Sequence, residues 1–389
     1  MTLDLVKLST HVKSMGNTLQ DRGIRYPGWV AHGRRQLRAL SRDWQELKAV
    51  ASQSNRRLAT PLGPLDKRRA LPDLPHAYRT IATDGSQIEP DRHGNADYYL
   101  LNVGWAVIQY GIGAAAELAS EASLYFEPED LYIVHGERRV PVQDRHLSAR
   151  RACREMAKAA DLAATPGTVG VPTVVLADGT LQVWVLADQP DNFLRDALLV
   201  PYLDEMKRVR DTGVPLASYM SRPRHSEVTG LLREATCKRD EDPCDACAGT
   251  LREQCIFERI TDRALFEDLD LGERSALFQA TLAPELERYY REQIPCFFYV
   301  NVGSELARVE VPSWTADNPD WLDLIQAVVF DQCRKGLGYP NALARAHEQA
   351  VVSSADRKAF AYFLDGMLAR LGVPHRSSEK QISKRLRAV

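Results

Sequence analysis

The sequence predicts an α/β protein built around a mixed β-sheet. Residues 78–83 and 97–110 are rich in Tyr, Leu, Val, Trp and Ile and are separated by a polar loop, a pattern typical of antiparallel strands. Residues 171–177 are apolar throughout and lie between helical patterns over 148–164 and 193–211. An apolar strand flanked by helices is typical of the centre of a sheet that is buried on both faces.

The N-terminal part is expected to be helical. Its apolar residues recur every three or four positions, at Leu37, Leu40, Trp44, Leu47 and Val50. Two prolines and a run of charges follow over residues 59–69, which predicts that this region ends before the main domain begins. We therefore expect a helical region over 1–75, a main domain over 76–374 and a basic tail over 375–389.

Further elements are expected after the central strand. They are strands over 214–219 and 296–302 and helices over 321–335 and 356–371. No repeat of fixed period is present, which argues against solenoids and propellers.

Composition and charge narrow the class of protein. The 389 residues are 44% hydrophobic and 26% charged, which excludes a collagen-like or wholly disordered chain. The net charge is −2, but residues 1–75 carry fourteen Lys or Arg against six Asp or Glu. A polyanion would therefore meet the basic ends, a local patch, or metal ions held by acids. For the tail from Arg376 to Arg387, contact with DNA or a partner and a solvated end both stay open.

The chain shows no membrane signal. It has no run of 18 apolar residues and no signal-peptide pattern at its N-terminus. We expect a cytoplasmic protein with no membrane contact.

Two similar motifs carry the strongest chemical signal. Asp84-Gly-Ser and Asp178-Gly-Thr each follow a strand pattern directly. Either motif alone is typical of a β-turn that ends a strand. If the two strands are neighbours and end at the same edge, the two carboxylates can share a pair of divalent ions, as two-metal phosphoryl transfer requires.

A third carboxylate would be expected from a helix beside these strands. Glu155 lies on the predicted helix just before the second motif, and Glu117 and Glu127 are competing candidates. Glu155 could instead be an exposed acid paired with Arg151, four residues earlier.

Near the C-terminus, a turn leads into a predicted helix, with Tyr339 before its start and His347 about two turns in. Beside a metal, such a pair could orient a phosphate or move a proton. A single helical histidine is also commonly structural or exposed.

Four cysteines crowd into one segment, which we treat as an insertion over residues 236–262. Their spacing is C-x6-C-x2-C-x7-C, formed by Cys237, Cys244, Cys247 and Cys255. Four thiolates can hold Zn²⁺ or an iron-sulfur cluster, and this spacing does not distinguish the two. Unligated thiols in a loop are the alternative.

The segment Gly111-Ile-Gly113-Ala-Ala-Ala116 fits a dinucleotide-binding pattern and would suggest a nucleotide-binding oxidoreductase. The preceding residues favour a hairpin strand, so a tight turn explains the glycines. The chain lacks a P-loop motif, so any translocation would require a partner ATPase.

The motifs, in this order, resemble the NurA nucleases. The resemblance uses Thr83 to Ser86, Leu176 to Leu181, Ser218 to Pro223, and Tyr339-Pro340 with His347. It implies an RNase H-like fold and a site formed by Asp84, Glu155, Asp178, Tyr339 and His347. It also implies manganese-dependent (or magnesium-dependent) cleavage of DNA, with 5′ to 3′ exonuclease and single-strand endonuclease activity, by a homodimer docked on a HerA-type hexameric helicase.

The sequence thus predicts a metal-dependent nuclease that processes DNA ends. The alternative is a catalytically inactive DNA-end or adaptor subunit of a HerA complex.

Overall fold

The computed structural model describes residues 5–54, 56–90, 96–187, 192–236 and 255–373. The chain forms two compact units. Unit 1 comprises Met1–Leu71, Ser221–Thr281 and Cys296–Val309, and unit 2 comprises Pro72–Met220, Leu282–Pro295 and Glu310–Val389. The first boundary lies near the boundary expected at residue 75, whereas unit 1 also takes in two later stretches.

Unit 2 contains a mixed sheet. Its strands are β2 (Tyr78–Ile88), β3 (Tyr99–Tyr110), β4 (Ala115–Tyr125), β7 (Thr173–Asp178) and β8 (Leu216–Met220). Strand β2 pairs antiparallel with β3, and β3 pairs antiparallel with β4. On its other side β2 pairs parallel with β7, which pairs parallel with β8. Three antiparallel strands followed by two parallel ones form the sheet of an RNase H-like fold, so the predicted fold class is confirmed.

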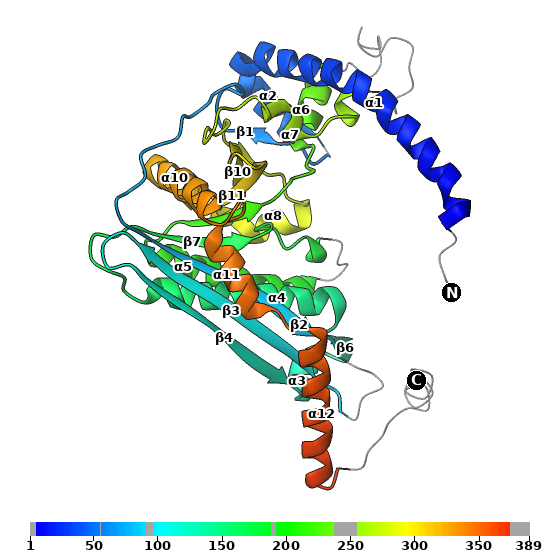
Figure 1. Cartoon of the computed structure of the whole chain (residues 1–389), viewed down its shortest axis with the longest axis vertical. Helices are drawn as coiled ribbons and strands as arrows, with labels where there is room; N and C mark the ends of the chain where they lie inside the picture. Colours follow the sequence, from blue (N-terminus) through cyan, green and yellow to red (C-terminus); the bar gives the residue numbers. More distant parts are fainter. Residues whose placement is uncertain (1–4, 55, 91–95, 188–191, 237–254, 374–389) are drawn as a thin grey trace. The chain divides into compact units, whose positions relative to one another are not determined.

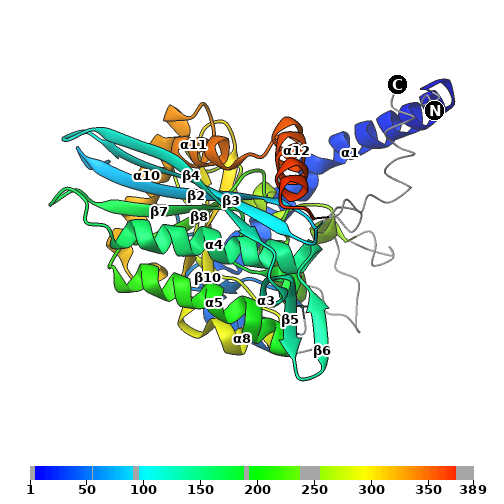
Figure 2. The same ribbon diagram turned by 90° about the horizontal axis from the view of Figure 1, so that it is seen from below.

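Helices lie on both faces of this sheet, as Figure 2 shows. Helices α4 (Asp144–Ala164) and α5 (Asn192–Asp211) cover one face. Helix α11 (Asn341–Ala350) crosses the other face. Along the chain it follows α10 (Pro319–Lys335). The prediction of a central strand buried on both faces is confirmed for β7, because Val174, Val175 and Leu176 are fully buried.

The first Asp-Gly motif lies inside a strand and not in a turn at its end. The sequence suggested that the strand stops at Thr83, but β2 continues to Ile88 because its pairing with β3 extends over its whole length. Its pairing with β7 ends earlier, at the pair Thr83–Ala177. Asp84 therefore lies at the point where one edge of β2 becomes open.

The Gly111 segment forms the turn of the β3–β4 hairpin. Gly111 and Gly113 have φ angles of 80° and 67°, and Ala114 N donates to Gly111 O. A Cβ at Gly111 would lie 2.2 Å from His76 O. A hairpin turn, as expected, accounts for these glycines.

Unit 1 combines N-terminal helices with four strands. Its larger helices are α1 (Leu5–Ala39), α2 (Trp44–Gln53), α6 (Glu227–Thr236) and α7 (Asp262–Phe266). Its strands are β1 (Thr60–Pro61), β9 (Phe278–Gln279), β10 (Pro295–Asn301) and β11 (Leu306–Pro312), the last two of which extend into unit 2 at one end. The single helix expected from 37 to 50 is divided by a 3₁₀ turn at Ser41–Asp43, where Asp66 N donates to the Ser41 hydroxyl.

The core of unit 1 is aromatic. Phe278 stacks on Phe297 with ring centroids 5.5 Å apart, and Phe266 stacks on Tyr299 at 5.1 Å. Asp262 is fully buried, and its carboxylate accepts bonds from the backbone N–H groups of Glu227, Val228 and Thr229 at the start of α6. These bonds satisfy donors that a helix leaves unpaired at its first turn.

The remaining elements are short, apart from the C-terminal helix (Figure 1). They are α3 (Pro128–Leu131), β5 (Tyr132–His135), β6 (Arg138–Pro141), α8 (Pro284–Tyr290), α9 (Ser313–Ala316), α12 (Ser354–Arg370) and 3₁₀ turns at Trp184–Leu186, Ile256–Glu258 and Arg291–Gln293. Helix α12 begins with a capping box formed by Ser353 and Asp356.

Two predictions concern segments at least partly outside the described residues. Cys237, Cys244 and Cys247 lie outside them, and Cys255 is buried within unit 1. The four-cysteine site for zinc or an iron-sulfur cluster therefore stays a prediction, as does the role of the tail over 375–389. In the described part of the chain, every helix is too short or too polar to cross a bilayer.

Candidate active site

Asp84 and Asp178 lie on neighbouring parallel strands. Because Thr83 of β2 pairs with Ala177 of β7, the next residue on each strand is an aspartate at the same level of the sheet. Gly179 continues the chain with a φ of 77°, a left-handed conformation that favours glycine. Its N–H donates to Tyr219 O on β8. The motif thus combines an acid at the strand end with a glycine that turns the chain away.

Glu155 reaches the sheet from α4, where Gly85 leaves room for it. A Cβ on Gly85 would lie only 2.3 Å from Glu155 Oε1 and 2.9 Å from Arg151 Cγ. The glycine that follows Asp84 therefore lets the helical carboxylate approach the backbone of β2. Glu155 also pairs with Arg151, with 3.1 Å between Oε1 and Nε. Of the alternative raised for Glu155, the ion pair with Arg151 is present, but the acid is not exposed.

The electrostatics confirm that the three acids influence one another. Burial raises the pKa of Glu155 to about 8, the Arg151 guanidinium opposes this shift, and the charges of Asp84 and Asp178 add to it. Burial also raises the pKa of Asp178 above its ordinary value. Like charges close together in a poorly solvated place favour the protonated forms. A cation placed among them would relieve this repulsion.

Tyr339 contacts the second aspartate. Its hydroxyl donates to Asp178 Oδ1 at 2.7 Å, and its ring packs edge-to-face on Tyr219 with centroids 5.4 Å apart. Burial and the charge of Asp178 raise the pKa of Tyr339 far above its ordinary value, so it remains a hydrogen-bond donor. A tight turn before it depends on Gly336, where a Cβ would lie 2.0 Å from Tyr339 O.

Helix α11 lies directly on the backbone of β3 because Gly104 has no side chain. A Cβ there would lie 2.4 Å from Ala350 N and 2.6 Å from Ala346 O. The end of α11 is held by two polar side chains of the sheet. Ser86 Oγ donates to Ala350 O at 2.5 Å, and Asn102 Nδ2 donates to the same oxygen at 2.9 Å.

This packing brings His347 to Asp84. Asp84 and Gly104 are paired residues of β2 and β3, so both lie on the face that α11 crosses. His347 Nδ1 lies 2.6 Å from Asp84 Oδ2, and 65% of its side chain remains exposed. The five residues predicted from the sequence, Asp84, Glu155, Asp178, Tyr339 and His347, are therefore brought together. The competing candidate Glu117 instead accepts a bond from Trp105 Nε1 on β3.

Sequence reasoning missed residues that fix these side chains in place. Glu310 of β11 is fully buried and accepts bonds from Thr180 Oγ1 at 2.8 Å and Leu181 N at 3.0 Å. It thereby holds the chain just after Asp178. The signal for Gly104 was a glycine inside a strand pattern, which commonly marks the close approach of another backbone.

The carboxylates suit a hard divalent cation. Mn²⁺ and Mg²⁺ prefer oxygen ligands, which Asp84, Asp178 and Glu155 supply. The buried Glu155 Oε1 has no well-directed hydrogen bond, so it can accept a further partner. In the described residues, no three His, Cys, Asp or Glu side chains are arranged to hold an ion as they stand. Arg151 in particular would have to turn away from Glu155 for all three acids to bind one.

The strand order and the acids at the β2–β7 edge define an RNase H-like protein with an acidic site. The chain belongs to the NurA family of nucleases, because residues 78–352 match the NurA domain.

Comparison with solved structures gives distant relatives. A crystal structure of NurA has 12% sequence identity and a TM-score of 0.39, covering 92% of this chain and 98% of that one. NurA bound to dAMP and manganese has 11% identity and a TM-score of 0.39, with coverage of 92% and 96%. A type 1 RNase H with the type 2 active-site motif has 12% identity and a TM-score of 0.23, covering 40% of this chain and 68% of that one. These scores are low, so the family assignment rests on the domain match. No curated protein matches the chain.

Proposed function

We propose that this chain is a metal-dependent deoxyribonuclease whose divalent ions, Mn²⁺ or Mg²⁺, are held by Asp84, Glu155 and Asp178. The observation that carries the proposal is the meeting of two aspartates on adjacent parallel strands with a glutamate from α4. The raised pKa values of Glu155 and Asp178 indicate repulsion that a bound cation would remove. Ions bound there would activate a water and stabilise the leaving oxygen of a phosphodiester.

His347 and Tyr339 then have distinct roles. Because a carboxylate only accepts hydrogen bonds, the contact of His347 Nδ1 with Asp84 places a proton on Nδ1. With the Nδ1 proton directed at Asp84, Nε2 is the ring nitrogen placed to take up a proton, or to return it, near a phosphate at this exposed position. Tyr339 keeps Asp178 Oδ1 in one orientation through its hydroxyl.

Family membership and the acidic site support a finer proposal. We propose 5′ to 3′ exonuclease and single-strand endonuclease activity on DNA ends, by a homodimer that works with a HerA-type hexameric ATPase. The chain lacks a P-loop, which agrees with an ATPase supplied by a partner.

A second candidate is an inactive DNA-end or adaptor subunit of the same complex. The Arg151–Glu155 ion pair favours it, because a guanidinium occupies one carboxylate that an ion would need.

An Mn²⁺-dependent digestion assay on end-labelled single- and double-stranded DNA separates the two. Wild type should cut, and Asp84→Asn, Glu155→Gln and Asp178→Asn should each lose cutting while keeping the melting temperature of a folded protein. Glu117→Gln is the matched control and should cut like wild type, because Glu117 is on β4, which does not pair with β2 or β7, and its carboxylate accepts from Trp105. Each variant is assayed with and without the cognate ATPase. Wild-type protein that cuts under neither condition would favour the adaptor.

A further inference from the structure

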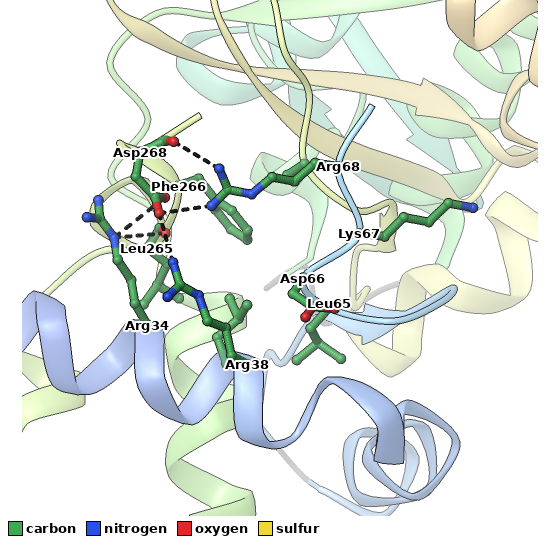
Figure 3. Close-up of a pocket in the computed structure, with 11 residues that line it drawn as sticks. Arg34, Arg38, Leu65, Asp66, Lys67, Arg68, Leu265, Phe266 and Asp268 are labelled. Carbon is green, nitrogen blue, oxygen red and sulfur yellow. Dashed lines mark hydrogen bonds and ion pairs between the residues drawn. The ribbon is translucent and has the colours of Figure 1, made fainter. Parts of the chain in front are cut away.

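Unit 1 contains a pocket of about 210 Å³ lined by an excess of positive charge. Figure 3 shows Arg34 and Arg38 on α1 and Arg68 on the following segment, all directed towards Asp268. Lys67 points away from this carboxylate. The pocket thus joins a helix near the N-terminus to a segment more than two hundred residues later.

The arginines of the pocket contribute unequally to packing within unit 1. Arg34 donates to Ala264 O at 2.8 Å and Leu265 O at 3.2 Å, so it holds α1 against α7. Arg68 donates to Asp268 O at 2.9 Å, and its side chain contacts the Asp268 carboxylate and Glu273. Both residues are therefore needed for packing within the unit.

Most of the hydrogen-bond donors of Arg38 and Lys67 have no partner in the described part of the chain. In the described part of the chain, Arg38 makes one hydrogen bond, from Nη2 to Asp268 Oδ2 at 3.2 Å, and 61% of its side chain is exposed. A guanidinium has five N–H donors, so four have no partner among those residues. Lys67 is exposed, and its ammonium has no hydrogen-bond or ion-pair partner among the described residues.

The positive and negative charges that line the pocket do not cancel one another. Arg34, Arg38, Lys67 and Arg68 line the pocket with only two carboxylates, those of Asp66 and Asp268. Counting Glu273 as well still leaves one positive charge in excess. Asp268 Oδ1 is also buried without a hydrogen bond, so a water that donates a hydrogen bond would satisfy it. A planar guanidinium and a separate exposed ammonium on the same unit can each bind the oxygens of a different phosphate.

We propose that this pocket is a second DNA contact, in which Arg38 and Lys67 bind backbone phosphates of a strand. The choice of DNA rests on the proposed function, whereas the phosphate chemistry rests on the pocket itself. Such a contact carries no sequence information and contributes affinity that decreases with salt.

The test is DNA binding by the full chain in EDTA, so that cleavage plays no part. Binding of a fluorescent single-stranded oligonucleotide is followed by anisotropy over a series of salt concentrations. Arg38→Ala/Lys67→Ala should bind about tenfold more weakly at low salt, with a salt slope smaller by about one to two. Two controls are needed. Arg38→Lys/Lys67→Arg should retain most of the affinity, and Lys48→Ala, which removes an exposed lysine of α2 outside the pocket, should bind like wild type.

The outcomes are distinct. Wild-type affinity and slope in the double alanine variant, with an unchanged melting temperature, would overturn the proposal. An equal loss in Lys48→Ala would overturn it too, because the effect would then be general charge. If calorimetry shows that the double variant loses binding of inorganic phosphate but not of DNA, the pocket serves free phosphate and the DNA contact is refuted. Failure of the nuclease assay in Mn²⁺ would leave all these binding results unaffected.

Discussion

Replacing Gly104 by alanine should disconnect His347 from the site without touching any acid. The added Cβ would lie 2.4 Å from Ala350 N, and α11 must retreat by about 1 Å to restore an ordinary contact. The backbone of Gly104 is not left-handed, so the contact alone is responsible for the effect. The 2.6 Å approach of His347 to Asp84 would then lengthen to about 3.6 Å, beyond hydrogen-bonding distance.

We expect a loss of about 1–3 kcal/mol in stability, typical of overpacking, and a fall of about 10²-fold in the cleavage rate, typical of a displaced acid–base group. Urea unfolding and single-turnover cleavage in Mn²⁺ measure the two effects. If the rate effect passes through His347, then Gly104→Ala/His347→Ala should be no slower than His347→Ala alone. Gly63→Ala is the control, because a Cβ there meets no atom within 4 Å. A Gly104→Ala variant with wild-type stability and rate would refute this account of α11.

Three further predictions concern the surroundings of the site. In EDTA, burial raises the pKa of Glu155 from about 4.5 in the unfolded chain to about 8, so wild type loses stability as the pH rises between these values. Glu155→Gln should therefore be more stable than wild type at pH 9, on the order of 1–3 kcal/mol, and equally stable at pH 4.5. If urea unfolding shows the same difference in stability at both pH values, the assignment of this pKa to Glu155 is contradicted. Thr180→Val removes a hydroxyl that donates to buried Glu310 and should cost about 1–3 kcal/mol and weaken Mn²⁺ binding in calorimetry, whereas Thr180→Ser should restore both. Leu337 is 98% exposed with a φ of 56°, so Leu337→Gly should stabilise the chain by about 1 kcal/mol, and a melting temperature no higher than that of Leu337→Ala would contradict this.

The central elements were predictable because their patterns are local. The run that became β7 was mostly apolar and β-branched and lay between two helical patterns, so its place inside the sheet followed from composition. The end of β2 was misjudged, because Asp84-Gly85 is typical turn chemistry. Pairing with β3 along its whole length outweighed that local preference. The break between α1 and α2 depends on Asp66, which no local pattern near Ser41 reveals.

The residues of the site also divide into those that local sequence patterns identify and those that they do not. Asp84 and Asp178 could be identified because each lies in a similar Asp-Gly motif directly after a strand pattern. The structure places them on adjacent strands. Gly104 showed only a general signal, a glycine inside a strand pattern, and Glu310 showed none, because their importance depends on partners far away in the sequence. The role of Gly104 is apparent only once α11, some 240 residues later, packs on it. The same holds for a buried glutamate that meets Thr180 from 130 residues away.

The separation of the site residues along the chain also matters during synthesis. Asp84 and His347 are 263 positions apart, and Tyr339 also comes from the last quarter of the chain. A ribosome that has produced β2, α4 and β7 has supplied every carboxylate of the site but neither the tyrosine nor the histidine. A polypeptide released early would therefore contain acids able to attract a cation, without the tyrosine and histidine that contact Asp178 and Asp84. The site would thus be completed only after α11 has been translated.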